Sequence, residues 1–373
     1  MSEILVQGGR VIDPADNIDI TGDVLIRDGV IAGVGETLHA SSDAEILDAR
    51  GKVVVPGLFD MHVHTYVGVG PSGFDADLHC LPAGVTTVAD GGSSGSATYA
   101  GFRDYVQLKA RTRTYAFINL SYVGLVGGRP MGELLHDDWI DGDGAVALAA
   151  AHPDLIRGIK VRVDERAVED RGHLAMAHAR DAAAKADLPL MVHICGSRLS
   201  LAELLAYMKP GDIITHMMTA RGEANLLRDD KSLQAAREAR ERGVIFDVAH
   251  GRSHFPWEYA ERLLEADFLP DVISSDLAAW SLDKPVVDLV TTMNKFLLLG
   301  LPLPEVIAGV TSRPAAVLGV QDVVGNLRAG TEADVTVLEW SAAPVELWDT
   351  DGQARTMPKP LKVAAVFRAG KRV

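Results

Sequence analysis

Two histidines, His62 and His64, end an apolar run that begins at Val53. If this run is a β-strand, its side chains alternate between the two faces, so both imidazoles point the same way. Two neighbouring imidazoles at the end of a buried strand can provide half of the ligands of a metal site. One His-x-His pair is a weak signal, because a buried histidine more often serves as a hydrogen-bond partner.

Other ionisable side chains also stand at the ends of apolar runs, namely Lys160, His193, His216, His250 and Asp276. Each of them would cost several kcal/mol to bury without a partner, so taken singly each is best interpreted as a hydrogen-bonded core residue. Their recurrence instead predicts that they converge on one site. The remaining histidines are interpreted as surface or loop residues without a metal role: His39, His79, His136, His152, His173, His178 and His254.

Lys160 is the unusual member of this set, because a protonated lysine repels divalent cations. Burial lowers the pKa of a lysine and frees its amine. A neutral amine can react with carbon dioxide to form a carbamate, an anionic oxygen ligand that can bridge two metal ions. The alternative for Lys160 is a structural ion pair with a nearby carboxylate.

The elements that must position these residues alternate along the middle of the chain. Strand-like runs are expected at 53–64, 84–91, 115–124, 156–163, 188–196, 212–218, 244–251 and 271–277, and helices at 99–113, 166–186, 199–208, 230–242, 256–267 and 286–299. Eight such βα units favour a parallel (β/α)8 barrel, whose active site lies at the carboxyl ends of the strands. A doubly wound sheet has less support, because no glycine-rich dinucleotide fingerprint follows the first strand.

Both ends of the chain have the pattern of short strands and turns, including an Asp28-Gly29 hairpin signal. Chain ends often lie close together in space. We therefore predict that residues 1–52 and 325–373 form one small β-sandwich domain, and that residues 53–324 form the barrel.

The composition excludes several classes of protein. The 373 residues are 47% hydrophobic and 23% charged, as in ordinary globular proteins. The net charge of −15 argues against a nucleic-acid partner. Only two cysteines, Cys80 and Cys195, are present, which excludes a disulfide framework and favours the cytoplasm. With no secretion signal or membrane-spanning run recognised, we expect no membrane partner and a homo-oligomer.

These residues, in this order, resemble the amidohydrolase superfamily of metal-dependent hydrolases. Motifs at residues 8–14, 311–316 and 325–334 resemble the opening and closing signatures of that superfamily. The resemblance implies two divalent metal ions, with zinc expected. It implies that His62, His64 and Asp276 hold one ion, that His193 and His216 hold the other, and that carbamylated Lys160 and a hydroxide bridge them.

The chain departs from the dihydroorotases within this superfamily. Tyr66 stands where a dihydroorotase has an arginine, and residues 277–280 replace its Ala-Pro-His signature. Residues 61–66, 89–93 and 159–162 resemble instead a branch often mislabelled dihydroorotase. Its members deacetylate N-acetyl or O-acetyl derivatives of small carboxylic acids, such as amino acids and 2-hydroxy acids, often of R or D configuration. A cyclic amidase of the dihydroorotase or hydantoinase type is the alternative, and a non-catalytic scaffold with a vestigial metal site is the third.

The net positive charge of such a centre favours hydrolysis. We expect a metal-bridging hydroxide to attack the acyl carbonyl while the more exposed metal polarises it, and Asp276 to take the proton of the water and pass it to the leaving group. His250 is predicted to hydrogen-bond the substrate or the developing oxyanion, with a hydrogen bond to a neighbouring loop as the alternative.

A carboxylate on the substrate requires a cation at the site. Arg162 follows Lys160 by two residues and so shares its strand face. Arginine suits bidentate recognition of a carboxylate. We predict that this role belongs to Arg162, assisted by Tyr122, or to a loop arginine: Arg198, Arg221 or Arg252.

Overall fold

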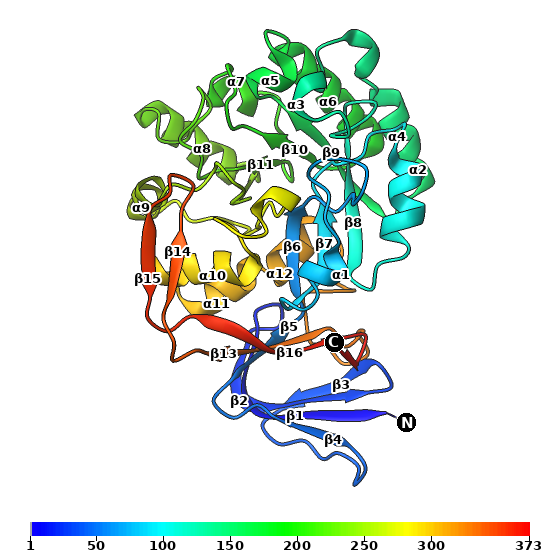
Figure 1. Ribbon diagram of the computed structural model, residues 1–373, viewed down its shortest axis with the longest axis vertical. Coiled ribbons are helices and arrows are strands. Elements are labelled where there is room, and N and C mark those ends of the chain that lie inside the picture. Colours follow the sequence, from blue (N-terminus) through cyan, green and yellow to red (C-terminus); the bar gives the residue numbers. More distant parts are fainter. Residues whose placement is uncertain (1) are drawn as a thin grey trace.

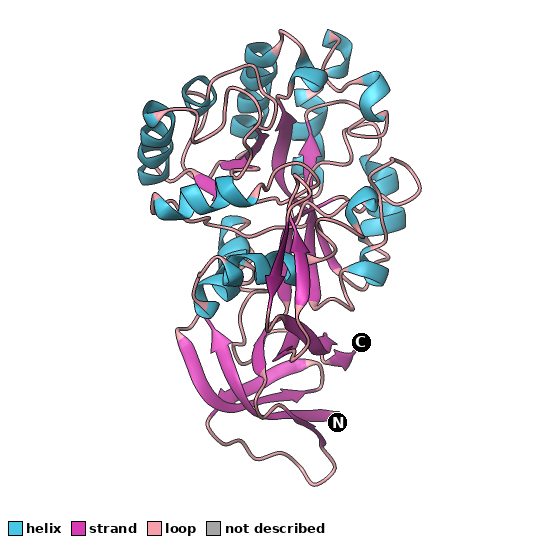
Figure 2. Ribbon diagram, turned by 60° about the vertical axis from the view of Figure 1, so that its left-hand side comes forward, coloured by secondary structure: helices cyan, strands magenta, loops and turns pink. Residues whose placement is uncertain are grey.

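The computed structural model describes residues 2–373, apart from the side chains at 129 and 130. Figure 1 shows a barrel of strands and helices standing on a β-sheet that carries both chain termini. Figure 2 shows the same division, with strands alone in the lower part and helices around the upper part.

The barrel contains a seven-stranded parallel sheet in the order β12-β11-β10-β9-β8-β7-β6. Its strands are β6 (Leu58–Val63), β7 (Val85–Asp90), β8 (Arg113–Asn119), β9 (Ile156–Arg162), β10 (Leu190–His193), β11 (Ile213–Thr215) and β12 (Ile245–Asp247). The segment 271–277 closes the ring through two parallel bridges, Asp247 to Val272 and Val63 to Leu277. The predicted (β/α)8 barrel is therefore confirmed, with an eighth strand reduced to isolated bridges.

Helices cover the outside of the barrel: α1 (Ala76–His79), α2 (Tyr99–Phe102), α3 (Gly128–Met131), α4 (Gly142–Ala151), α5 (Glu165–Val168), α6 (Gly172–Ala186), α7 (Leu201–Leu205), α8 (Asp230–Glu241), α9 (Trp257–Glu265), α10 (Leu289–Leu298), α11 (Leu303–Gly309) and α12 (Ser312–Val317). The sequence pattern does not predict α4, whose alanines and glycines lack a clear apolar stripe. The helix expected at 166–186 is divided into α5 and α6. No helix in the described part of the chain combines the length and the apolar character needed to cross a bilayer.

The terminal segments form one eight-stranded sheet in the order β17-β16-β13-β5-β1-β2-β3, with β4 paired to β1. Its strands are β1 (Glu3–Asp13), β2 (Ile18–Arg27), β3 (Val30–Gly35), β4 (Glu45–Asp48), β5 (Val53–Pro56), β13 (Val335–Trp340), β16 (Leu361–Arg368) and β17 (Lys371–Arg372). Apolar side chains from both ends of the chain, such as Val6, Val54, Val337 and Phe367, share one core. Both termini thus build one β module, as predicted.

The apolar run 53–64 holds two strands, not the single strand that its pattern predicts. Its first part, β5, pairs with β1 and β13 in the terminal sheet, and its second part, β6, enters the barrel. Only Gly57 separates them, and a Cβ at that residue would lie 2.1 Å from the Oγ1 of Thr86. The two parts of the molecule are therefore joined at a point where only glycine fits.

A hairpin of β14 (Val345–Trp348) and β15 (Ala354–Met357) leaves the terminal sheet and forms a separate two-stranded sheet. In Figure 1 it lies beside α9 and α10. The indole nitrogen of Trp257 donates to the carbonyl of Gln353 at 3.2 Å, and Arg355 pairs with Glu261 at 2.9 Å. Part of the segment 325–373, expected wholly in the terminal domain, therefore packs on the barrel.

Candidate metal centre

The first group of ligand side chains lies where β6 meets the eighth segment of the barrel. His62, His64 and Asp276 each direct a ligand atom to a point where all three atoms are within 4.8 Å of one another. The Nε2 of His64 is 3.1 Å from Oδ1 of Asp276, and the Nε2 of His62 is 3.7 Å from the same oxygen. Barrel closure thus brings β6, at one edge of the seven-stranded sheet, together with the segment 271–277 that bridges it to β12.

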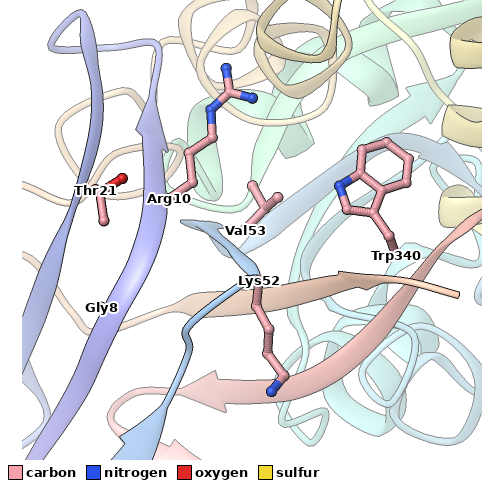
Figure 3. Close-up of a pocket in the computed structure, with 7 residues that line it drawn as sticks. Gly8, Arg10, Thr21, Lys52, Val53 and Trp340 are labelled. Atoms are coloured by element: carbon pink, nitrogen blue, oxygen red, sulfur yellow. The ribbon is translucent and has the colours of Figure 1, made fainter.

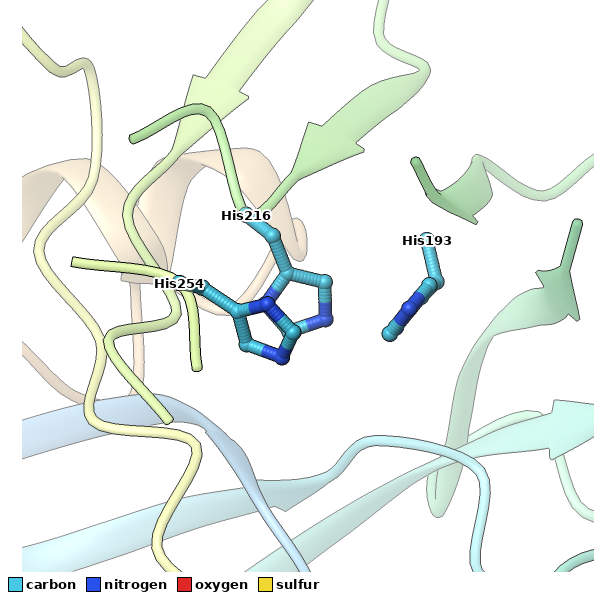
Figure 4. Close-up of side chains that lie close together, drawn as sticks. All are labelled: His193, His216 and His254. Atoms are coloured by element: carbon cyan, nitrogen blue, oxygen red, sulfur yellow. The ribbon is translucent and has the colours of Figure 1, made fainter. Parts of the chain in front are cut away.

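A second group of ligand atoms within 4.8 Å of one another comes from His193, His216 and His254. Figure 4 shows the rings of His216 and His254 overlapping, with His193 facing them. The ring centroids of His216 and His254 are 3.9 Å apart, and those of His193 and His216 are 4.2 Å apart. His254, interpreted from the sequence as a loop residue without a metal role, does lie in a loop, but it is buried and grouped with these two histidines. The available signal was its position in the loop after β12, four residues beyond His250.

Lys160 lies next to the first group. Its Nζ is 3.1 Å from the Nε2 of His62 and 3.3 Å from the sulfur of Met191. The ring of His62 in turn lies 5.3 Å from that of His216, so the two groups are adjacent parts of one site. Burial is the main cause that lowers the pKa of Lys160 to about 7, which makes the neutral amine accessible near neutral pH.

Outer hydrogen bonds orient the histidines of the first group. The Nδ1 of His62 donates to the hydroxyl of Thr215 at 3.0 Å, and that hydroxyl donates to Asp247 at 2.7 Å. The Nδ1 of His64 lies 2.9 Å from the hydroxyl of Ser93. In both rings the outer contact is made by Nδ1, which leaves Nε2 directed at the site for a metal ion.

The second group is oriented by backbone carbonyls. The Nδ1 of His216 donates to the carbonyl of Ala249 at 2.9 Å, which leaves Nε2 as its ligand atom. The Nε2 of His193 donates to the carbonyl of Cys195 at 3.2 Å, which leaves Nδ1. Each ring thus has one nitrogen held by the protein and one available.

The turn after β7 makes space for the site. A Cβ at Gly91 would lie 2.3 Å from the ring of His62, and one at Gly92 would lie 2.7 Å from the Cβ of Lys160. Asp90 fixes this turn by accepting hydrogen bonds from the backbone nitrogen of Ser93 at 2.6 Å and of Gly92 at 3.2 Å. The segment 89–93 therefore needs glycine at residues 91 and 92, because the side chains of His62 and Lys160 leave no room for a Cβ there.

Two residues of the site have a left-handed backbone. The φ angles of His216 and Asp276 are 70° and 49°. Such conformations cost about 1–3 kcal/mol for a non-glycine residue, and they cluster at functional sites. The left-handed backbone at these two residues therefore lowers the stability of the folded protein while it directs their side chains into the site.

The electrostatics favour neutral ligands. Burial is the main cause that holds the pKa values of His62, His193 and His216 well below the usual value for histidine. Neutral imidazoles and carboxylates are suitable ligands for divalent cations such as zinc. The donor set of buried imidazoles, one carboxylate and a lysine with an accessible neutral amine therefore fits two such ions.

His250 is completely buried, and the protein engages both of its ring nitrogens. Its Nδ1 donates to the carbonyl of Gly251 at 2.8 Å, and its Nε2 lies 2.6 Å from the Nζ of Lys295. These contacts fit the alternative weighed from the sequence, a hydrogen bond to a neighbouring loop, better than contact with a substrate.

The candidate arginines differ in their partners. Arg162 contacts Glu133 at 2.7 Å and Asp164 at 2.6 Å, so both arms of its guanidinium are occupied. Glu133, a buried loop residue, is a partner that the sequence pattern does not reveal. Arg198 is likewise paired, with Glu165 and Asp170.

The other two arginines are exposed, Arg221 in the loop after β11 and Arg252 in the loop after β12. Within residues 2–373 neither of them has a carboxylate partner. Tyr122 is also exposed, with 46% of its surface accessible.

A pocket of about 230 Å³ lies elsewhere, in the terminal sheet, lined by Arg10, Lys52 and Trp340 among others (Figure 3). Arg10 is paired with Asp19 at 2.8 Å, and Lys52 lies 3.9 Å from Glu339. Its cations are thus already neutralised, and it contains none of the ligand side chains described above.

The sequence model of the Amidohydrolase family matches residues 152–373. The chain belongs to the amidohydrolase family. This amidohydrolase is 33% identical over 343 residues to a deacetylase of Brucella anthropi, covering 90% of this chain and 84% of the relative. It is also 33% identical over 343 residues to a deacetylase of Agrobacterium fabrum, covering 90% and 83%. The resemblance that the sequence motifs indicate is confirmed, and the chain is a hydrolytic enzyme.

Among solved structures, this amidohydrolase is similar to a crystal structure described as a dihydroorotase. The TM-score is 0.92 at 29% identity, and the match covers 100% of this chain and 98% of the other. The agreement over both parts of the chain includes the barrel and the terminal sheet.

Proposed function

We propose that this amidohydrolase is a binuclear metal-dependent deacetylase of N-acetyl or O-acetyl derivatives of small carboxylic acids. The observation that carries the proposal is the pair of adjacent ligand groups, with the buried Lys160 in contact with His62 of the first group. Its similarity to relatives named deacetylases supports the acetyl group as the part removed.

His62, His64 and Asp276 would hold one ion, and His193 and His216 would hold the second. Lys160, after its amine forms a bond to the carbon of carbon dioxide and releases one proton, would offer a carbamate oxygen to each ion. Zinc suits these nitrogen and oxygen donors. Two divalent cations bound there supply Lewis-acid activation of the acyl carbonyl and of the attacking water.

Asp276 is the proposed proton carrier. Its Oδ1 faces His64, and its Oδ2 lies 3.8 Å from the Nε2 of His254, so the carboxylate lies between the two ligand groups. A carboxylate there can accept the proton of the attacking water and deliver it to the departing amine or alkoxide.

The substrate carboxylate is assigned to Arg221, with Arg252 as the second candidate. Arg162 is already neutralised by two carboxylates, whereas the two loop arginines are exposed and follow strands whose carboxyl ends carry the second ligand group. Burial is the main cause that lowers the pKa of His254, and the charges of Arg162 and then Arg221 lower it further, so Arg221 is near that group.

A cyclic amidase is the second candidate, favoured by the likeness to a structure described as a dihydroorotase. Against it, Tyr66 replaces the expected arginine, and its hydroxyl donates to the carbonyl of Thr98 at 2.8 Å. Tyr66 is therefore buried in the barrel wall and offers no cation to a substrate.

The test is acetate release from a panel of acetylated D- and L-amino acids and acetylated 2-hydroxy acids, with zinc-loaded enzyme. We expect turnover of at least one acetylated carboxylate, with a preference for the R or D isomer. Ring opening of dihydroorotate or a hydantoin without acetate release from any member of the panel would establish the cyclic amidase instead.

A further inference from the structure

His254 has no place in the ligand set that the proposed function uses, yet it lies among its members. The residue is 7% exposed, and its Nε2 is 3.8 Å from Oδ2 of Asp276, beyond hydrogen-bond distance. Its Nδ1 has no hydrogen-bond partner among the described residues. A buried polar group without a partner costs free energy, so this imidazole requires a ligand that would compensate its burial.

The ring is positioned to share a ligand with its neighbours. The ligand atoms of His193, His216 and His254 all lie within 4.8 Å of one another. Three nitrogens that share one tetrahedral zinc ion, each at about 2.0–2.1 Å, lie about 3.4 Å from one another. Closing each separation by about 1.4 Å or less, through side-chain rotation, therefore brings all three imidazoles to one ion.

The loop that carries His254 is held on both sides. His250 is anchored by Lys295 at 2.6 Å, and its ring stacks on Phe255 at 4.6 Å between centroids. Between them Gly251 has a φ of 51°, and a Cβ there would lie 2.3 Å from Asp276 and 2.6 Å from His254. The position of His254 is thus fixed by buried contacts at residues 250 and 255.

We propose that His254 is a third imidazole ligand of the ion that His193 and His216 hold. The inference rests on the metal centre of the proposed function and not on the identity of its substrate. It gives the second ion three neutral nitrogen donors from the protein. That ion therefore stays bound when Lys160 carries no carbamate.

The test is a titration of the metal-free protein with Zn²⁺ in the presence of a competing chromophoric chelator. The wild-type protein is expected to bind two ions tightly. In buffer free of carbon dioxide, the ion held by His193, His216 and His254 is expected to stay tightly bound. His254→Asn should keep one tight ion and weaken the other by about 100-fold or more, since even residues that only support a ligand contribute 10- to 100-fold. Ser253→Asn, which introduces the same side chain one residue earlier, should bind like the wild type.

Two measurements keep the outcome clear. Circular dichroism and thermal unfolding of the metal-free variants establish that His254→Asn is folded; His254→Gln is titrated in parallel as a second variant. Unchanged affinity for both ions in a folded His254 variant would overturn the proposal, even if acetate release fell. Failure of the wild-type protein to bind Zn²⁺ at all would overturn the metal centre and with it the proposed function.

Discussion

The Nζ of Lys160 lies 3.1 Å from the Nε2 of His62, so the fourth strand of the barrel meets the first at the centre of the site. An ammonium group there would stand beside a nitrogen directed at a metal ion. The chemical state of this one lysine therefore decides whether the site attracts or repels cations.

Carbamate formation at Lys160 should depend on pH. Burial lowers its pKa to about 7. Below that pH the amine is protonated and cannot attack carbon dioxide, so at pH 6 only about one tenth of the molecules can react. We expect metal-free protein given Zn²⁺ and bicarbonate to regain activity several-fold faster at pH 8 than at pH 6. Equal rates, or an unmodified mass at Lys160 in active protein, would contradict the bridge.

Asp276→Asn should reduce kcat by about 100- to 10,000-fold, the range for loss of a general acid or base. The amide retains an oxygen ligand, so most of the metal should stay bound. Acetate release and metal content are measured together, with the exposed Asp283→Asn as the control. Near wild-type turnover would remove Asp276 from proton transfer.

Arg221→Gln should raise KM for a carboxylate substrate by about 10- to 100-fold, the loss of one charged hydrogen bond, with little change for a neutral acetyl ester. Arg228→Gln is the control, since Arg228 follows β11 in the same loop but pairs with Glu223. Arg162→Gln should instead lower the melting temperature, because Glu133 and Asp164 lose their shared cation. If Arg162→Gln alone raised KM, the carboxylate would belong to Arg162.

Gly251→Ala should abolish activity and weaken metal binding, because its Cβ would meet Asp276 and His254. Gly319→Ala is a matched control: Gly319 has a φ of 63°, with nothing within 4 Å of an added Cβ. Both variants carry the cost of a left-handed alanine, so their melting temperatures both fall. Only Gly251→Ala should lose acetate release, and an equal loss in both would assign the effect to general destabilisation.

Lys295→Met should lower the free energy of unfolding by about 3 kcal/mol or more, measured by urea denaturation. The Nζ of Lys295 contacts the carbonyls of Pro285 and Trp348 at 2.8 and 2.7 Å, besides His250 at 2.6 Å. All three acceptors would be left unsatisfied in the interior. Lys284→Met, at an exposed lysine over the ring of Trp348, should cost much less. Similar decreases in the free energy of unfolding for both variants would show that the hydrogen bonds of Lys295 do not stabilise the protein as expected.

The barrel could be predicted because its strands are continuous apolar runs that end in ionisable residues, as at His193 and His216. The division of the run 53–64 could not, because Gly57 sits inside an unbroken apolar pattern and only the contact with Thr86 shows why glycine is required. The helix α4 escaped prediction because alanine and glycine give little periodicity.

The site, like the fold, contains residues that could be predicted from the sequence and residues that could not. Its strand-end residues follow from the order of the barrel strands, which places every carboxyl end at one mouth. His254 and the pairing of Arg162 with Glu133 depend on how loops fold back over that mouth. Such contacts join residues with no fixed spacing in the sequence, so no local pattern reports them.

The terminal sheet has a consequence for how the protein is made. During synthesis, β1 and β5 leave the ribosome well before β13, the strand that covers the free edge of β5. Until then the apolar side chains of Val6 and Val54 lack Val337 and Phe367, their partners in the core. An uncovered edge strand invites pairing with another nascent chain. A polypeptide stopped short of residue 335 is therefore expected to aggregate through its first sixty residues, whatever the state of its barrel.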